Sequence, residues 1–363
     1  MTNLDIAHRR LHNQQLARQM FEKPEDVVGW LGAVQSQDYA GAKWAVGQRV
    51  PGSVDAELEK AFNDGRILRT HLLRPTWHFV LPADIQWMLT ATAPRVHALN
   101  AYYYRQLGLD AEVLARTNDL IAKALEGGKQ LTRPELMSVV EQGGIDPGSG
   151  IRSSYIVMRA ELDGVICSGA RRGKQFTYAL LDERAPQGRS MARDEALAEL
   201  VKRYFTSHGP ATVQDLIWWS SLTMAEAKEG IEMVKSELVR EVIDGRPYWS
   251  SGSTVPVPPA KDGPPVAYLL PNYDEYISYK DRSAIFDEAS AGKMDPEKNL
   301  VFPHIIVIDG RMVGTWKRTL TRSTVVIETS LFRPLTGDER GALEDAAEQY
   351  GKFLGFPAVL KVG

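Results

Sequence analysis

Four consecutive polar residues near the N-terminus are the first candidates for chemistry. They are Gln35, Ser36, Gln37 and Asp38. The first three end a stretch, residues 23–37, that we predict to be a mainly apolar helix, and Asp38 follows it. Glutamines two positions apart point to different faces of a helix, but at a helix end or in a tight turn both amides could reach one cavity. The alternative is a polar helix terminus with both glutamines in solvent, where polar residues usually lie.

The sequence lacks the familiar signatures of nucleotide, metal and hydrolase sites. It contains no P-loop, no G-x-S-x-G, no H-E-x-x-H and no G-x-G-x-x-G that opens a nucleotide-binding fold. The single Cys167 excludes an internal disulfide and a cysteine-built zinc site. His8 and His12 have the spacing of two ligands on one helix, but without a third ligand nearby they are better explained as a surface pair. We expect no metal and no cofactor.

The composition is that of a globular protein of the cytoplasm. Of the 363 residues, 44% are hydrophobic and 25% are charged, which suits two or three folded domains. The polar N-terminus and the absence of an apolar run of about 18 residues predict neither a signal peptide nor a membrane span. A lone cysteine favours a reducing compartment. With 43 basic and 46 acidic residues, the net charge is −3, so nucleic-acid binding would require local basic patches.

One order of elements, helices followed by a two-stranded hairpin, occurs three times along the chain. In the middle copy Thr132 is predicted to cap a helix, with Glu135 completing a capping box. The later copy has Thr212 and Asp215 in the same relation. The order of helices and hairpin is that of a winged helix. The alternative is that this combination is common and the likeness accidental.

The earliest copy is weaker but aligns with the middle one. Asp64–Gly65 falls on Asp163–Gly164, and residues 77–79 fall on residues 176–178. We therefore predict an α+β protein with three tandem winged-helix blocks and a small β-barrel-like domain that ends in a helix. The boundaries are residues 1–110 for the first block, 111–190 for the second, 191–252 for the third and 264–363 for the C-terminal domain.

The C-terminal domain is predicted from a change in pattern. Residues 251–265 are rich in Ser, Gly and Pro and indicate a linker. Beyond them, β-branched and aromatic residues predict strands, with a hairpin at Asp309–Gly310 and a final helix capped by Thr336. Trp218 and Trp219, in a helix of the third block, are predicted to be core residues rather than platforms for stacked bases.

Several segments resemble the AlkZ-like DNA glycosylases, a family of bacterial winged-helix proteins. Residues 30–38, Trp-Leu-Gly-Ala-Val-Gln-Ser-Gln-Asp, resemble its Q-x-Q motif. Residues 69–80 resemble its R-T-x-L-M-R-G-T-x-H-x-V segment, and residues 310–316 resemble its G-x-x-x-G-x-W hairpin. Residues 269–276 and 281–283 resemble its L-L-P-x-[FY]-D-x-[YF] and D-R segments. The resemblance covers nearly the whole chain in the right order, and the motifs together are more specific than any one alone.

The resemblance implies three tandem winged helices and a β-barrel-like domain around a concave DNA-binding face. It also implies that Gln35 and Gln37 act in hydrolysis of the N-glycosidic bond of an alkylated purine. YcaQ-like relatives have Asp in place of the second glutamine, which places this chain on the AlkZ side. Two residues depart from the family's pattern: Pro75, where the family usually has Gly, and the polar Ser36 between the glutamines.

Neutral amides suit this reaction. An N7-alkylguanine is already cationic and leaves readily, so the site needs mainly to hold a water against C1′, and an amide can accept from that water while its NH₂ group donates elsewhere. Asp38 could add negative potential or could be a solvent residue at a helix end. His78 could contact the sugar-phosphate, or could be a histidine buried among core aromatics.

Basic residues beside predicted hairpins are the candidates for contacts to phosphate. For any single one, a solvated surface charge is the simpler explanation, so the recurrence at hairpin ends is the stronger argument. Arg322 follows the last hairpin as well. The candidates for DNA contact are Arg66, Arg69, Arg74, Arg171, Arg172, Lys174, Lys317 and Arg318.

We expect a monofunctional DNA glycosylase for N-alkylated purines, bulky or crosslinked adducts included. Its partner would be double-stranded DNA, without a membrane, and it would act as a monomer. No lysine adjoins the glutamines to form a Schiff base. The alternatives are a winged-helix transcription regulator, which would dimerise, and a protein that binds lesions without cleaving them.

Overall fold

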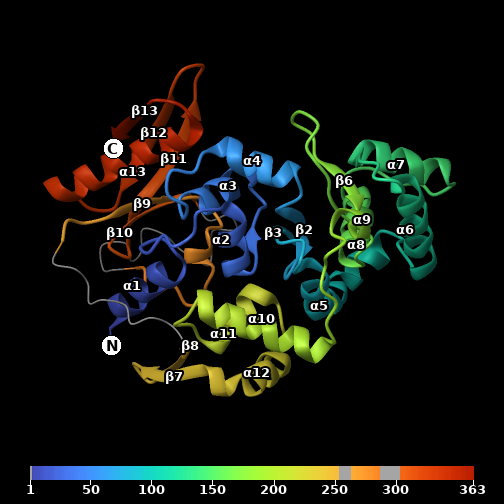
Figure 1. The fold of residues 1–363 in the computed structure, drawn as a ribbon, viewed down its shortest axis with the longest axis horizontal. Coiled ribbons are helices and arrows are strands. Elements are labelled where there is room, and N and C mark those ends of the chain that lie inside the picture. The colour runs from blue at the N-terminus through green and yellow to red at the C-terminus, as the bar shows by residue number, and fades with distance from the viewer. Residues whose placement is uncertain (1, 253–262, 287–302) are drawn as a thin grey trace.

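The chain combines helical blocks with a five-stranded sheet near its C-terminus, which gives a mixed α+β fold. The computed structural model describes residues 2–252, 263–286 and 303–363. In Figure 1 the second block (green) lies at one side, the C-terminal domain (red) lies at the other, and the first block lies between them. Most of the predicted linker, residues 251–265, lies outside the described residues.

The first block contains a strand where the sequence predicts a helix. Helix α2 ends at Leu31 because Gly32 adopts a φ of +81°, a conformation that favours glycine. The prediction of a helix through Gln37 is therefore wrong beyond Leu31. Val34 and Gln35 instead form β1 and pair with Phe79 and His78 of β3. The elements of this block are α1 (Asn3–Asn13), α2 (Pro24–Leu31), β1 (Val34–Gln35), α3 (Tyr39–Gly47), α4 (Asp55–Asn63), β2 (Leu68–Leu72), β3 (Thr76–Val80) and α5 (Ile85–Gln106).

The long helix α5 contains Pro94, which cannot donate a hydrogen bond to the Thr90 carbonyl one turn earlier. The guanidinium of Arg193, at the start of the third block, donates to that carbonyl at 3.0 Å instead. The proline is thus accommodated by a contact between the first and third blocks.

The second block has its own hydrophobic core, which includes Ile121, Leu136 and Ile156. The predicted capping box of Thr132 and Glu135 is confirmed, with the Glu135 carboxylate accepting from the Thr132 N–H at 2.7 Å. The elements are α6 (Ala111–Leu125), β4 (Leu131–Thr132), α7 (Arg133–Gln142), α8 (Ile151–Leu162), β5 (Ile166–Ser168), β6 (Thr177–Leu180) and α9 (Leu181–Arg184).

The third block repeats the capping box at Thr212 and Asp215, as predicted. The prediction that both neighbouring tryptophans are core residues is correct for Trp219, which is 1% exposed, and wrong for Trp218, which is 40% exposed. Adjacent positions on a helix face different directions, so only one of the two can point into the core. The elements are α10 (Arg193–Ser207), α11 (Val213–Ser220), α12 (Met224–Met233), the short 3-10 helix η1 (Lys235–Glu237), β7 (Leu238–Ile243) and β8 (Arg246–Ser251).

One arrangement of strands recurs in the three blocks. In the first two, the sheets have the orders β1-β3-β2 and β4-β6-β5, so the last strand is central and pairs with a short strand that precedes the second helix. In the third block an antiparallel bridge from Ala211 to Trp249 of β8 takes the place of that short strand. The order of elements is therefore helix, short strand or bridge, helix, helix, strand and strand in all three.

The C-terminal domain corrects the prediction of a β-barrel-like structure. Its described strands form an open sheet in the order β13-β12-β11-β10-β9, so the two outer strands do not pair with each other. The Asp309–Gly310 hairpin and the Thr336 cap are confirmed. The elements are β9 (Ala267–Leu270), η2 (Glu275–Ile277), β10 (Ile305–Ile308), β11 (Arg311–Leu320), β12 (Val325–Leu331), α13 (Gly337–Leu354) and β13 (Ala358–Val362).

The first block shares a hydrophobic core with the C-terminal domain. Trp44 of α3 contacts Tyr350 of α13 at 4.9 Å between ring centroids, and Tyr350 contacts Trp316 of β11 at 5.2 Å. All three side chains are buried, and such large aromatic contacts contribute strongly to stability. The two regions are therefore fixed relative to each other. None of the described helices is long and apolar enough to cross a membrane.

Candidate functional site

The segment from Gln35 to Asp38 is a tight connection between β1 and α3 rather than a helix end. The Ser36 N–H donates to the Trp77 carbonyl at 2.7 Å, which extends the pairing of β1 with β3 by one residue. Asp38 then caps α3 by accepting from the Gly41 N–H at 3.0 Å. Both glutamines therefore come from one loop whose two ends are anchored. Of the two conformations considered for this segment, a helix end and a tight turn, the structure shows the turn.

The side chain of Gln35 is held by Arg74, in the turn between β2 and β3. The Arg74 Nη2 donates to the Gln35 Oε1 at 2.7 Å. A guanidinium can only donate, so the amide must turn its oxygen toward Arg74 and keep its NH₂ group on the other side. The turn places Arg74 inward because the preceding Leu73 adopts a left-handed φ of +60°. Burial lowers the pKa of Arg74, while the nearby Glu275 acts to raise it.

The backbone of Gln35 contacts a carboxylate from the C-terminal domain. The Gln35 N–H donates to the Glu275 Oε1 at 2.9 Å, across 240 positions of sequence. Glu275 is 1% exposed, and its other oxygen accepts from the Trp219 indole N–H at 2.9 Å. The His208 Nε2 lies 3.3 Å from the same oxygen. The loop of the first block therefore meets the third block and the C-terminal domain at this carboxylate.

Gln37 is exposed, in contrast to the half-buried Gln35. Its Oε1 lies 3.5 Å from the Trp77 N–H, which is a long and weak hydrogen bond. The next residue, Asp38, has its carboxylate 3.6 Å from the Arg318 guanidinium of β11. The amide of Gln37 is thus the group of this loop that is best placed to exchange its hydrogen bonds for a ligand or a water.

Arg69, on β2, contacts the backbone of the same loop. Its guanidinium donates to the Ser36 carbonyl at 3.2 Å and lies between the rings of Trp77, at 4.3 Å, and Phe176, at 4.5 Å. The side chain is 7% exposed, and burial lowers the pKa of Arg69 to about 10, so it is still protonated at neutral pH. Arg69 and Arg74 are therefore turned toward the loop instead of toward solvent, where a phosphate would lie.

His78 lies directly opposite Gln35 in the β1–β3 pair. It is 1% exposed, and its Nδ1 lies 3.0 Å from the Thr76 carbonyl, so that nitrogen carries the proton. Burial, and secondarily the charge of Arg74, lowers the pKa of His78 to about 3. Of the two roles considered for His78, a contact to the sugar-phosphate and a buried neutral histidine, the structure shows the buried histidine.

The remaining basic candidates are spread over exposed or half-exposed positions. Arg66 pairs with Glu25 at 2.6 Å, and Arg172 pairs with Glu135 at 2.8 Å. Arg171 lies over the rings of Tyr39 and Phe176, each at 4.9 Å. Arg318 also donates to the Tyr350 hydroxyl at 2.9 Å. The side chains that extend into solvent also include Lys174, Lys317 and Arg322.

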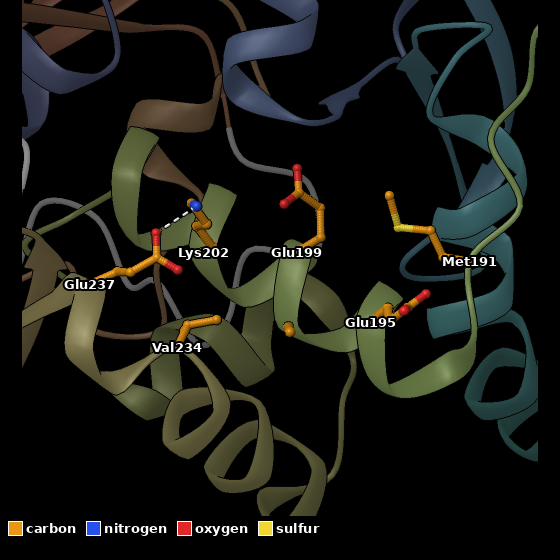
Figure 2. A pocket seen from close by; sticks show the side chains of 7 residues that line it. Met191, Glu195, Glu199, Lys202, Val234 and Glu237 are labelled. Atoms are coloured by element: carbon orange, nitrogen blue, oxygen red, sulfur yellow. Dashed lines mark ion pairs between the residues drawn. The ribbon is translucent and has the colours of Figure 1, made fainter.

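A separate hollow beside α10 does not share this chemistry. Figure 2 shows its lining, which includes Glu195, Glu199 and Glu237, with an ion pair between Lys202 and Glu237. An excess of carboxylates repels phosphate, and none of the candidate residues lines this hollow. In residues 2–252, 263–286 and 303–363, no group of three or more His, Cys, Asp and Glu side chains is arranged to hold a metal ion.

Sequence reasoning missed Glu275 and the inward direction of Arg74. The signal for Glu275 was weak: it is one of two acidic residues inside the mainly apolar and aromatic stretch 268–279. Charged residues are rarely fully buried unless they are paired, so acids in such a stretch are candidates for buried contacts. Nothing local in the sequence names their partners.

Comparisons with known proteins agree on one family. The family model described as DNA glycosylase AlkZ-like matches residues 28–353. The chain is 24% identical over 333 residues to an interstrand DNA cross-link repair glycosylase from Streptomyces sahachiroi, covering 85% of each chain. The solved structure of the Streptomyces sahachiroi DNA glycosylase AlkZ has a TM-score of 0.82 at 21% identity and covers 100% of both chains. The two proteins therefore have the same fold.

Proposed function

The chain belongs to the AlkZ-like DNA glycosylase family, and we infer that it hydrolyses the N-glycosidic bond of N-alkylated purines in duplex DNA. The family match confirms the resemblance found in the sequence motifs. The observation that carries the proposal is the anchored loop, which supplies two neutral amides, Gln35 and Gln37, from positions two residues apart. A reaction whose leaving group is already cationic needs such positioning more than it needs a strong acid.

We propose that the three helical blocks are winged-helix modules. The recurring order of helices and strands, with the last strand central in the first two sheets, supports this assignment. Three modules in one chain can follow a duplex without a second subunit, so we expect a monomer. The module boundaries are those predicted from the sequence, residues 1–110, 111–190 and 191–252.

We propose different roles for the two glutamines. The Gln35 oxygen already accepts from Arg74 at 2.7 Å, so Gln35 can offer mainly its NH₂ group to a substrate. Within the part of the chain that the structure describes, the Gln37 oxygen has a single, long contact of 3.5 Å to the Trp77 N–H, and it can exchange this contact for a hydrogen bond from water. In this arrangement Gln37 accepts from the attacking water, and Gln35 donates to that water or to the sugar.

The proposed reaction balances without a general acid. The C1′–N9 bond of an N7-alkylguanine breaks, and its electron pair stays with the base, which leaves neutral. The oxygen of water bonds to C1′ of the sugar cation, and one proton of that water passes to solvent. The Asp38 carboxylate adds negative potential near the loop. The Arg318 guanidinium, 3.6 Å away, partly neutralises this potential. No lysine adjoins the glutamines, so we propose a monofunctional enzyme.

We propose that the exposed basic side chains contact the phosphates of the duplex. Lys174 and Arg172 lie in the turn between β5 and β6, and Lys317 lies on β11. Arg66, Arg171 and Arg318 are half-buried or paired and could contribute after their partners shift. The contacts of Arg69, which is buried, and of Arg74, which donates to the Gln35 side chain, assign these two arginines to support of the loop instead.

The relative from Streptomyces sahachiroi is named for repair of interstrand cross-links. We therefore propose that the substrates of this chain include bulky or crosslinked N7-alkylguanines. An exposed Gln37 suits this class, because a crosslinked base resists the flipping that an enclosed pocket would require.

The first experiment is base release from a duplex that carries a single N7-methylguanine. The parent protein should form abasic sites without a strand break before alkali. Gln37→Ala should slow release by about 100-fold or more, as the loss of a positioned catalytic group does. Gln142→Ala, which removes an exposed glutamine of α7, is the matched control and should leave the rate unchanged.

A crosslinked duplex is the second substrate. Release from the crosslink alone would restrict the proposal to crosslinks. Binding of both duplexes with no release from either would contradict the glycosylase proposal and favour a protein that binds lesions without cleaving them.

A further inference from the structure

Glu275 is a buried carboxylate at which three parts of the chain meet. It comes from the C-terminal domain and contacts the first block through the Gln35 N–H, at 2.9 Å from Oε1. It contacts the third block through the Trp219 indole, at 2.9 Å from Oε2. Buried charges are costly unless they are paired or hydrogen-bonded, so a fully buried carboxylate with this set of donors requires an explanation.

We propose that Glu275 is a positioning residue for Gln35: it fixes the backbone of the loop so that the Gln35 amide is held in its reactive orientation. The inference rests on the proposed function of Gln35. Arg74 holds the amide oxygen at 2.7 Å, and Glu275 holds the backbone N–H of the same residue at 2.9 Å. Gln35 is thereby fixed at both its backbone and the end of its side chain.

The chemistry of the donors explains why a carboxylate is needed. The Gln35 N–H and the Trp219 indole can only donate, and each faces a different oxygen of Glu275. A carboxylate accepts on both oxygens. An amide at the same position accepts on one oxygen only and brings an NH₂ group against a donor on the other side. Glu275→Gln therefore keeps the size of the side chain but cannot accept from the Gln35 N–H and from the Trp219 indole at the same time.

The surrounding charges keep the carboxylate ionised. Burial acts to raise the pKa of Glu275, but hydrogen bonds from His208 and from the Gln35 N–H hold it below the usual value for glutamate. Arg74, whose guanidinium interacts with Glu275 at longer range, supplies a compensating positive charge. The acceptor role on both oxygens is therefore available at neutral pH.

Asp274 provides a matched control one residue earlier in the same turn. It is 0% exposed and accepts from the Arg49 guanidinium at 2.8 Å and 2.9 Å. It has no hydrogen bond to Gln35 among those of the described residues. Asp274 also caps the turn that carries Glu275 by accepting from the Tyr276 N–H at 2.9 Å, and Asn keeps an oxygen for that N–H. Asp274→Asn should therefore disturb folding, as the loss of a buried carboxylate does, without releasing the Gln35 N–H.

The first test measures the loop and does not depend on activity. Hydrogen exchange of a peptide that covers residues 33–37 should accelerate by about tenfold or more in Glu275→Gln, because the Gln35 N–H loses its acceptor for part of the time. It should change by less than about twofold in Asp274→Asn. Equal acceleration in both variants, or none in Glu275→Gln, would overturn the proposal.

The second test measures single-turnover base release and duplex affinity. Glu275→Gln should slow release by about tenfold or more with little change in the duplex Kd, since small displacements of a catalytic group are costly. The loss should persist in a Gln37→Ala background and shrink to less than about twofold in a Gln35→Ala background, where the amide to be positioned is gone. An equal loss in both backgrounds would assign Glu275 a general structural role.

The two proposals fail in different ways. A parent protein that releases no base from any alkylated duplex would contradict the proposed function, while the exchange measurement would still show whether Glu275 fixes Gln35. A parent protein that releases base, with independent losses in the variants, would contradict the role of Glu275 alone. Should Glu275→Gln fail to fold, Trp219→Phe is the second variant. It removes one donor to the other oxygen of Glu275 and leaves the Gln35 contact, so exchange in residues 33–37 should change by less than about threefold.

Discussion

The first and second blocks use the same junction between a short strand and a helix for different purposes. In the second block Thr132 pairs with Thr177 and is itself the cap of α7. In the first block Gln35 has the matching place opposite His78, but α3 is capped only at Asp38. Residues 36–38 have no counterpart in the second block. Gln37 therefore lies in a short insertion, and Gln35 directly precedes it, at a junction where the repeat otherwise requires only a helix cap.

The hairpin turns of the two blocks differ in length in the opposite direction: the first block, which has the longer strand–helix junction, has the shorter turn. In the first block the turn of residues 73–75 is tight, and Arg74 points inward to Gln35. In the second block residues 169–176 form a longer turn that exposes Arg172 and Lys174. The comparison shows how one scaffold can place a cation either against the side chain of a neighbouring loop or in solvent. Turn length and burial decide between the two, rather than residue type.

The largest effect on base release is expected from shortening the strand–helix junction of the first block to the length of that in the second block. Deletion of residues 35–37 leaves Asp38 to pair opposite His78 and to cap α3. Base release should fall below detection because both amides are lost, while duplex binding persists. The free energy of unfolding should fall by about 1–3 kcal/mol, since Arg74 and the buried Glu275 both lose a hydrogen-bond partner. Urea unfolding and base release are the measurements.

The control keeps the length of the loop and removes only the amides. Gln35→Ala combined with Gln37→Ala should be equally inactive. A deletion variant that does not fold beside a double variant that does would show that residues 35–37 are part of the scaffold and not an addition to it.

The next largest effect comes from replacing one arginine in each of the two hairpin turns, Arg74 in the first block and Arg172 in the second. Arg74→Met should slow base release by about tenfold to 100-fold at saturating duplex, with Kd near that of the parent, because the Gln35 amide loses its partner. Arg172→Met should instead raise Kd and reduce the slope of log K against log salt by about 1, with the saturated rate unchanged. Single-turnover kinetics and salt titrations measure both. An Arg74→Met variant that weakens binding alone would return Arg74 to the set of phosphate contacts.

His78 lies opposite Gln35 in the first block, and Thr177 lies opposite Thr132 in the second. Because only the histidine titrates, it should make the free energy of unfolding depend on pH. The pKa of His78 is about 3 in the folded protein, and an unfolded histidine has a pKa of about 6.5. Its contribution to stability is therefore complete above about pH 6.5 and is lost as the pH falls toward 3, at up to about 1.4 kcal/mol per pH unit. His78→Thr, which copies Thr177 of the second block, should flatten the free energy of unfolding between pH 6.5 and 4. An unchanged slope would show that other groups dominate this range.

The smallest effect concerns the two caps. Thr132→Ala and Asp38→Ala should each cost about 1 kcal/mol in free energy of unfolding, the usual value for a lost N-cap. Only Asp38→Ala should also slow base release, by a few-fold, because Asp38 adjoins Gln37. Thermal unfolding and single-turnover rates test the pair. A loss of rate in Thr132→Ala would contradict the separation of roles between the two junctions.

Sequence reasoning was most reliable where the determining contacts are local. The caps at Thr132, Thr212 and Thr336 depend on residues three positions away, and all three were predicted. The hairpin at Asp309–Gly310 is equally local and was also predicted. The error over residues 32–37 arose because apolar residues continue past Gly32, and a short buried strand has the same apolar composition as a buried helix.

The exposure of side chains followed from the packing of distant elements. Trp218 and Trp219 are adjacent and identical in type, and only the position of Glu275 and the core beside α11 determines which one is buried. Arg69 and Arg74 were predicted beside a hairpin, and their inward direction depends on where the loop of residues 34–38 and Phe176 lie. Residue type gives charge, but not the side of the hairpin on which the charge lies.

The sequence alone determined the family, the repeated order of elements and the pair of glutamines, because these are patterns of composition and spacing along the chain. The tertiary structure decided which groups act on those glutamines. Arg74 and Glu275 lie 39 and 240 positions from Gln35, and only folding brings one to its side-chain oxygen and the other to its backbone N–H. A hydrogen bond requires atoms to lie within about 3 Å in the right direction, and separation along the chain contains no such information.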